Sequence, residues 1–109
     1  MAKYSVLFRF HLGRGYTQLS DEERTKLREH WPLLDVFAKW KKAGIKLKGA
    51  ITCSSHPEGF AHHLIFEVDS LEQMREMDND VFLGEASRYI EKLDFHIGST
   101  GMEERWAEL

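Results

Sequence analysis

The sequence predicts an α+β protein with the ferredoxin-like element order βαββαβ. Three observations carry this prediction: four segments alternate between apolar and polar residues, two amphipathic helical segments separate them, and a serine precedes each helical segment. Alternation with a period of two is typical of strands with one buried face, and apolar residues at steps of three and four are typical of helices. We therefore expect a four-stranded antiparallel sheet with two main helices on one face and the other face open.

The first strand is predicted over residues 3–12, KYSVLFRFHL. One face of this strand is apolar and should enter the core; it consists of Tyr4, Val6, Phe8, Phe10 and Leu12. The opposite face carries Arg9 and His11. Gly13 and Gly15 follow in a stretch that we interpret as a turn, because the lysine and serine of a phosphate-binding loop are missing.

The first helical segment begins with a capping box, in which Ser20 and Glu23 each satisfy a backbone N–H group at the helix start. Its apolar stripe consists of Leu27, Trp31, Leu34, Phe37 and Trp40. Pro32 interrupts the segment, and because proline has no N–H to donate, we expect a kink or a break into two helices. Gly44 is the expected left-handed cap at the end.

The second strand is predicted over residues 45–54. Its alternation assigns Ile45, Leu47, Gly49, Ile51 and Cys53 to the core face, and Ala50 and Thr52 to the open face. The third strand is predicted over residues 60–68, after a turn at 56–59. Its alternation directs His63 to the open face and His62 toward the helices.

A second capping box, Ser70 and Gln73, opens the other helix, whose buried side should hold Leu71, Met74 and Met77. Residues 79–89 are predicted as a loop with a short helical turn, and residues 90–98 as the fourth strand. We expect the polar tail, residues 99–109, to dock through Met102 and Trp106. The whole chain, residues 1–109, is predicted to be one domain with its core over about 3–98.

Composition limits the partners that we expect. The formal net charge of −3 argues against nucleic acid or an anionic membrane as the main partner. No apolar run has membrane-spanning length, and the first ten residues lack the features of a signal peptide. The chain has one cysteine, Cys53, which suits a reducing compartment. These features predict a cytoplasmic protein.

The open face of the predicted sheet collects ionisable side chains. Its members are Arg9, His11, His63, Glu67, Asp94 and His96. One interpretation is a solvated surface with cross-strand ion pairs. Another is a pocket roofed by a second subunit, in which burial shifts pKa values toward those suited to proton transfer. Imidazoles beside a carboxylate are also normal metal ligands, but no strict metal-binding motif is present, so we assign no metal and no cofactor.

Several segments resemble the YCII-related family. Residues 27–50 read LREHWPLLDVFAKWKKAGIKLKGA, and the part from Arg28 to Gly49 is similar to that family's RExHLxxLxxLxxAGxLxxxGP pattern. Residues 80–95 are similar to its DPFxxAGLxxxVEVxPF signature. Residues 66–77 also resemble the family's strand exit and second helix. The resemblance implies a homodimer in which two sheets pack open face to open face, a dimeric α+β barrel. It places the family's suspected catalytic histidine at His30 and its aspartate at Asp80.

These observations lead to two functional hypotheses. The first is an enzyme of isomerase, lyase or cyclase type that acts on a small cyclic or aromatic organic acid or phenol in a pocket between helices and open sheet face, by cofactor-independent acid–base catalysis. Its candidate catalytic residues are His30, Asp80, His63, His11 and Asp94. Its candidate substrate-binding residues are Arg9, Glu67 and His96, because a guanidinium group suits a carboxylate or phenolate. The second hypothesis is a non-catalytic, stress-associated dimer that binds a ligand or metal.

Overall fold

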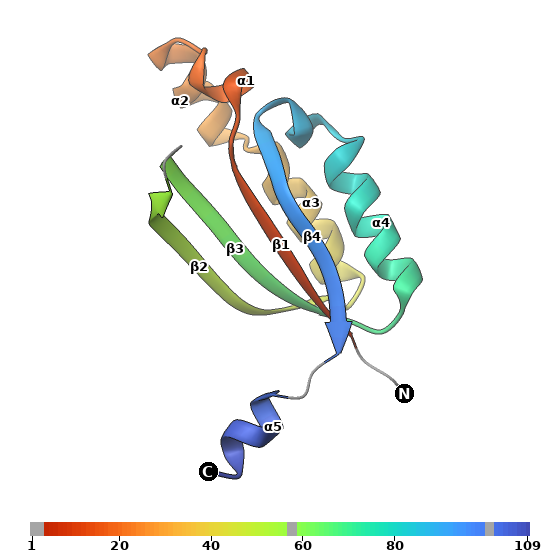
Figure 1. Ribbon diagram of the computed structural model, residues 1–109. Coiled ribbons are helices and arrows are strands. Elements are labelled where there is room, and N and C mark those ends of the chain that lie inside the picture. Colours follow the sequence, from red (N-terminus) through yellow and green to blue (C-terminus); the bar gives the residue numbers. More distant parts are fainter. Residues whose placement is uncertain (1–3, 57–58, 100–101) are drawn as a thin grey trace.

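The computed structural model of the chain describes residues 4–56, 59–99 and 102–109, without the side chains of residues 53–56, 59–61, 92–94 and 99 (Figure 1). In chain order the elements are β1 (Tyr4–Leu12), α1 (Arg14–Thr17), α2 (Asp21–Glu29), α3 (Pro32–Lys42), β2 (Lys46–His56), β3 (Gly59–Val68), α4 (Leu71–Phe82), the 3-10 helix η1 (Glu85–Arg88), β4 (Ile90–Ser99) and α5 (Met102–Ala107). The predicted order βαββαβ is confirmed, and the short elements α1, η1 and α5 are added to it.

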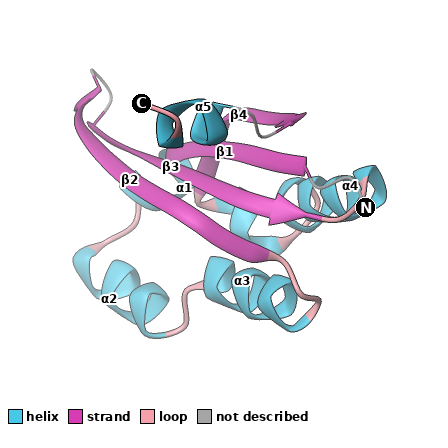
Figure 2. Cartoon of the chain, turned by 90° about the horizontal axis from the view of Figure 1, so that it is seen from below, coloured by secondary structure: helices cyan, strands magenta, loops and turns pink. Residues whose placement is uncertain are grey.

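The four strands form one antiparallel sheet with the order β2-β3-β1-β4. The first strand, β1, is central and pairs with both β3 and β4, as the sequence predicts. Helices α2, α3 and α4 lie on one side of the sheet (Figure 2). The opposite side, which we call the open face, carries no helix packed across its strands within the described residues. In this part of the chain no helix is long and apolar enough to cross a membrane.

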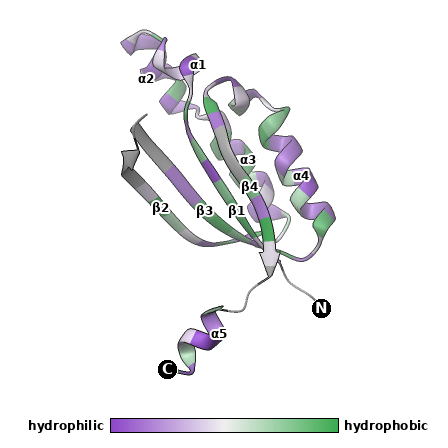
Figure 3. Ribbon diagram, viewed as in Figure 1, coloured by the Kyte–Doolittle hydropathy of each residue, from purple (hydrophilic) through white to green (hydrophobic). Residues whose placement is uncertain are grey.

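The core lies between β1 and the two long helices. It is built from side chains that are at most 7% exposed, among them Val6, Phe8 and Phe10 of β1, Leu33 and Trp40 of α3, Ile45, Phe66 of β3, and Met77 and Val81 of α4. Burying a side chain of this size stabilises the fold by about 1.5–3 kcal/mol relative to leaving it exposed. Figure 3 shows the corresponding bands of hydrophobic and hydrophilic residues along α4.

The first helical segment is split as its proline predicts. The Ser20 side chain accepts a hydrogen bond from the backbone N–H of Glu23, and the Glu23 carboxylate accepts one from the N–H of Ser20, which completes the predicted capping box. Helix α2 ends at Glu29, and Pro32 begins α3, where its missing N–H costs no helical hydrogen bond. Gly44 has a φ of 90° and ends this helical segment, as predicted.

The second helix differs from the prediction at both ends. The Ser70 side chain caps Gln73, but the Gln73 side chain accepts from the N–H of Asp69 instead of that of Ser70, so only half of the capping box forms. At its other end α4 continues to Phe82, whereas we predicted a loop from residue 79. Val81 explains the extension, because it is 1% exposed and continues the buried stripe of the helix.

Strand β2 contains a register shift that reverses part of the predicted alternation. Leu47 pairs with Phe66, and Gly49 pairs with Ile65, which leaves Lys48 as an extra residue. One extra residue exchanges the two faces of the strand beyond it. The prediction that Gly49 and Ile51 face the core, with Ala50 and Thr52 on the open face, is therefore wrong. Ile51 is 64% exposed and pairs with His63; the Cys53 side chain lies outside the described residues.

Three further predictions need correction. Leu71 was expected on the buried side of α4 but is 50% exposed. The stretch after β1 forms the short helix α1 instead of a plain turn. In the described part of the chain, the tail does not dock through Met102 and Trp106, which are 80% and 78% exposed. Helix α5 lies beyond the end of the sheet, on the side away from α2 and α3 (Figures 1 and 2).

Candidate functional site

A mostly apolar pocket lies on the helix-covered side of the sheet, where α2 and α3 approach β1 and β3. Its volume is about 400 Å³, which is within the usual range for a small-molecule site. The pocket, which we call the helix-side pocket, is lined by Phe10, Leu12, Tyr16, Arg28, Trp31, Leu33, Leu34, Phe37, His62 and Leu64. Four of these side chains carry polar groups, namely Tyr16, Arg28, Trp31 and His62. An apolar cavity with a few polar groups is the usual form of a ligand site.

His62 enters the pocket from β3 and is held in place by two neighbours. Its ring stacks on that of Phe10, with 5.0 Å between the ring centroids and 29° between the planes. Its Nδ1 lies 2.9 Å from the Oγ1 of Thr52 on β2. Thr52 reaches this side of the sheet only because of the register shift at Lys48. The irregularity in β2 therefore helps to build the site.

The environment of His62 favours a neutral imidazole. Burial is the main cause that lowers its pKa below the usual 6.5, and the positive charge of the neighbouring His63 lowers it further. A neutral imidazole can accept a proton at one nitrogen and hold a proton at the other. The Thr52 hydroxyl can donate or accept, so the contact at Nδ1 is compatible with either tautomer.

Arg28 and Tyr16 form a second polar group in the pocket wall. The Nε of Arg28 donates a hydrogen bond of 3.0 Å to the hydroxyl oxygen of Tyr16. Tyr16 is 8% exposed, and its ring meets that of Trp31 edge-on, with centroids 6.0 Å apart. The contact uses one of the five N–H donors of the guanidinium group. The remaining donors suit a carboxylate, which binds such a planar group with two parallel hydrogen bonds.

A larger apolar groove adjoins the helix-side pocket. It has a volume of about 600 Å³, lies between α3 and the neighbouring strands, and shares Phe37 and Leu64 with the pocket. Lys41 and Lys46 also line it. The apolar surface available to a ligand thus extends along α3 beyond the pocket itself.

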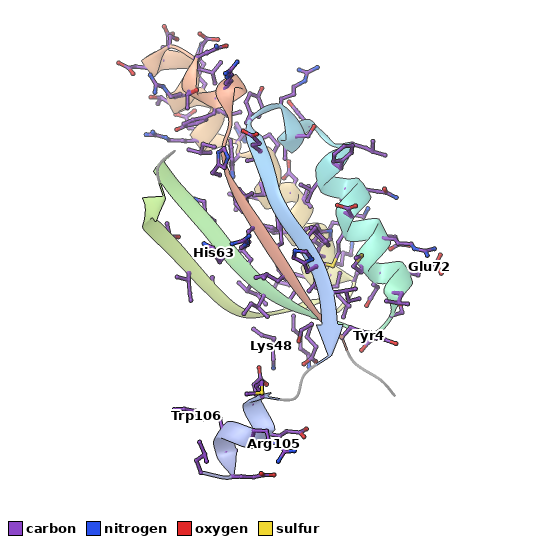
Figure 4. All side chains as sticks on the ribbon, viewed as in Figure 1. Tyr4, Lys48, His63, Glu72, Arg105 and Trp106 are labelled. Atoms are coloured by element: carbon purple, nitrogen blue, oxygen red, sulfur yellow. The ribbon has the colours of Figure 1, made fainter. Side chains whose placement is uncertain are left out.

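The candidates on the open face occupy the positions that antiparallel pairing predicts. Arg9 lies opposite His63 on one side and opposite Asp94 on the other, so one row crosses three strands. The Nε of Arg9 is buried, and the side chain of Asp94 lies outside the described residues. Figure 4 shows the His63 side chain on β3. The next row along β1 places the exposed His96 opposite Leu7.

Glu67 and His11 lie toward opposite ends of β1. The Glu67 carboxylate is 3.9 Å from the Nζ of Lys48, the extra residue of β2. His11 is 5% exposed; its Nδ1 is 3.0 Å from the carbonyl oxygen of Leu12, and its Nε2 is 3.5 Å from Glu91. His11 therefore interacts with the start of β4 and contributes to another cavity, described below.

His30 and Asp80 are not brought together. His30 follows the last residue of α2, and its side chain is exposed. Asp80 accepts hydrogen bonds from Lys39 Nζ at 2.8 Å and Trp40 Nε1 at 2.9 Å, near the end of α3. Trp40 follows Pro32 by eight residues, or about 12 Å of helix. The two residues therefore lie toward opposite ends of α3, and their catalytic roles stay predictions.

The helix-side pocket was not identified as a site from the sequence. The alternation of β3 correctly predicts that His62 faces the helices, but the alternation of β2 predicts the wrong face for Thr52, and neither pattern selects Arg28 or Tyr16 as site residues. One available signal was that His62 is the polar member of an otherwise apolar stripe with Leu64, Phe66 and Val68. As for metals, the described residues contain no group of three or more His, Cys, Asp or Glu side chains placed to hold an ion.

Comparisons with known proteins support the fold and leave the family open. Comparison with family models and with curated proteins finds no match, so the YCII resemblance stays a prediction. Among solved structures, a protein provisionally named a chlorite dismutase superposes with a TM-score of 0.56 at 15% identity, over 90% of this chain and 45% of that one. The fold is ferredoxin-like. The chain spans less than half the length of that protein.

A second structure is less similar. The C-terminal domain of the MgtC protein from Mycobacterium tuberculosis superposes with a TM-score of 0.48 at 11% identity, over 92% of this chain and 88% of that domain. Neither comparison identifies a substrate for this chain. The functional argument therefore depends on the residues of the site.

Proposed function

We propose that the protein is a small-molecule enzyme that carries out acid–base chemistry on an aromatic or cyclic organic acid in the helix-side pocket. The observation that carries this proposal is one apolar cavity of about 400 Å³ with an imidazole and a guanidinium group in its wall. The lowered pKa of His62 keeps its imidazole neutral near pH 7, which is the form that can accept a proton. The YCII resemblance supports small-molecule chemistry of the same class.

Each part of the pocket has a role in this mechanism. Arg28, oriented by Tyr16, binds the carboxylate of the substrate, and the aromatic and aliphatic walls hold its ring. His62 removes a proton from the bound molecule, and Thr52 fixes the orientation of the imidazole. Returning the proton at another position gives an isomerase, while loss of a leaving group or attack within the molecule gives a lyase or cyclase. No redox partner is needed for any of these steps.

The open face provides the second part of the proposal, a homodimer. Ile51 and Ile65 are 64% and 40% exposed on this face, and a sheet with helices on one side normally covers its other side as well. Packing two open faces together would bury both isoleucines. It would also enclose the row of His63, Arg9 and Asp94, for which the predicted substrate-binding and catalytic roles stay proposals. We further expect the dimer to act in the cytoplasm.

Hydrogen–deuterium exchange into the ligand tests the enzyme proposal, because an acid–base catalyst exchanges carbon-bound protons of its substrate in heavy water. A panel of aromatic and cyclic carboxylic acids is incubated with the protein and followed by proton NMR. We expect exchange or conversion of at least one acid, and a loss of about 10²–10⁴-fold in rate for His62→Gln. The variant His63→Gln changes the adjacent residue on the other face, and comparing the two variants distinguishes a base in the helix-side pocket from the candidate base on the open face.

Two outcomes would contradict this proposal. If His63→Gln or His30→Gln abolishes the reaction and His62→Gln preserves it, the catalytic base lies outside the helix-side pocket. If acids bind in the pocket but neither exchange nor react, the second hypothesis, a non-catalytic binding protein, is correct.

A further inference from the structure

A second, polar cavity lies at the end of the sheet where β1 leads into α1 and η1 leads into β4. Its volume is about 580 Å³, and of the helix-side pocket's lining residues it shares only Leu12. The polar side chains that line it are His11, Arg14, Thr17, Ser87, Arg88 and Glu91. Two arginines from segments far apart in the sequence thus contribute to one cavity.

The backbone holds these two arginines at the same place. Gly15 lies so close to the carbonyl group of Arg88 that a Cβ at position 15 would overlap its oxygen. The N–H of Gly13 donates a hydrogen bond of 2.9 Å to the carbonyl oxygen of Tyr89. Tyr16 is buried and anchors the same turn. Helix α1 is therefore fixed against the junction of η1 and β4, and Arg14 is fixed near Arg88.

The cavity carries an excess of positive charge. Within the described residues, neither Arg14 nor Arg88 forms a side-chain hydrogen bond or ion pair, whereas Arg24 on α2 pairs with Asp21 at 3.0 Å. The acidic group in the lining is Glu91, whose carboxylate lies 3.5 Å from the Nε2 of His11. Both arginines line the same cavity, so an anion bound in it would be attracted by two positive charges.

The hydrogen-bond donors of the cavity suit a tetrahedral oxyanion. Each guanidinium group presents several N–H donors in a planar fork that matches phosphate oxygens. The Ser87 hydroxyl already donates to the carbonyl oxygen of Gly84 at 2.6 Å, so the arginines are the main donors. Nδ1 of His11 lies 3.0 Å from the carbonyl oxygen of Leu12.

We propose that this cavity, the α1–η1 cavity, binds a phosphate group through Arg14 and Arg88, either as the free ion or as the end of a phosphomonoester. Such a group carries a charge of about −1.5 to −2 at pH 7, which suits two guanidinium groups. The proposal does not depend on the helix-side pocket, because its two arginines line neither that pocket nor the groove beside it.

NMR titration of the full chain with inorganic phosphate, and separately with glycerol 3-phosphate, tests the proposal at constant ionic strength. We expect saturable shifts of the Arg14 and Arg88 Nε–H signals. Replacing either residue, as Arg14→Ala or Arg88→Ala, should weaken binding by about tenfold or more. The matched control is Arg75→Ala, an exposed arginine on α4 that lines neither cavity. Tighter binding of the ester than of the free ion would identify a phosphomonoester as the ligand; the reverse would identify the free ion.

Three results would overturn the proposal. The first is a failure of the shifts to saturate with both probes, and the second is that Arg75→Ala weakens phosphate binding as much as Arg14→Ala or Arg88→Ala does. The third is that acetate binds as tightly as phosphate under the same conditions. Because all three arginines are exposed, the variants should fold, and circular dichroism checks this. The deuterium-exchange assay of the helix-side pocket is unaffected by any of these results, so the two proposals fail separately.

Discussion

At the scale of single residues, His62 links the site to the stability of the protein. Its pKa is lowered from 6.5 chiefly by burial. At pH values between the lowered pKa and 6.5, the unfolded chain therefore binds more protons at this residue than the folded chain does. Stability rises with pH wherever the unfolded state binds more protons. The neutral form of His62 is thus the form that is compatible with the folded pocket.

This linkage gives a pH prediction. The contribution of His62 to the free energy of unfolding should be fully present above about pH 6.5 and should decrease as the pH falls toward the lowered pKa. Urea denaturation of the wild type and of His62→Gln over this range measures it. The difference between the two curves should change with pH in this window, because the other five histidines are common to both proteins. A constant difference would show that the pKa of His62 is the same in the folded and unfolded chains.

At the scale of elements, Asp80 joins α4 to α3. It accepts hydrogen bonds from Lys39 and from the indole N–H of Trp40, which is 2% exposed. The hydrogen bond between Lys39 and Asp80 and the negative charge of Asp80 also raise the pKa of Lys39. The geometry gives Asp80 a structural role that its position in the YCII-like signature does not suggest.

The Asp80→Ala variant separates this structural role from a catalytic one. It leaves the indole N–H of Trp40 buried without its acceptor, which should destabilise the protein by about 1–3 kcal/mol. Lys39→Ala removes only the exposed partner and should have a much smaller effect. Urea midpoints measure both. If Asp80→Ala is as stable as the wild type while the deuterium-exchange reaction is lost, the predicted catalytic role is correct and the structural one is wrong.

The elements also show what sequence patterns could predict. Alternation located all four strands, and Pro32 and Ser20 fixed the break and the start of the first helical segment. Alternation cannot reveal an added residue such as Lys48, because apolar residues occupy both sides of β2 beyond it. Thr52 was misplaced for this reason. The contact between Arg28 and Tyr16 joins two segments whose relative position depends on packing, so no local pattern indicates it.

At the scale of the whole molecule, the uncovered sheet predicts self-association. We expect light scattering at micromolar concentration to give the mass of a dimer. Ile51→Glu should shift the equilibrium toward the monomer, because it would bury a charge between the two sheets. The matched control is Leu83→Glu, since Leu83 is 76% exposed next to α4 on the helix side. A monomeric wild type, or equal effects of the two variants, would contradict the sheet-to-sheet arrangement.

The break at Pro32 has a consequence for how a ligand enters the helix-side pocket. None of the nine residues of α2, all of which the structure describes, is buried. The break also separates α2 from α3, whose Leu33 and Trp40 are held in the core. Local opening requires least free energy where few apolar contacts must be broken. The wall that carries Arg28 should therefore exchange its amide protons faster than the sheet does, and the rate of ligand entry should follow the opening of α2.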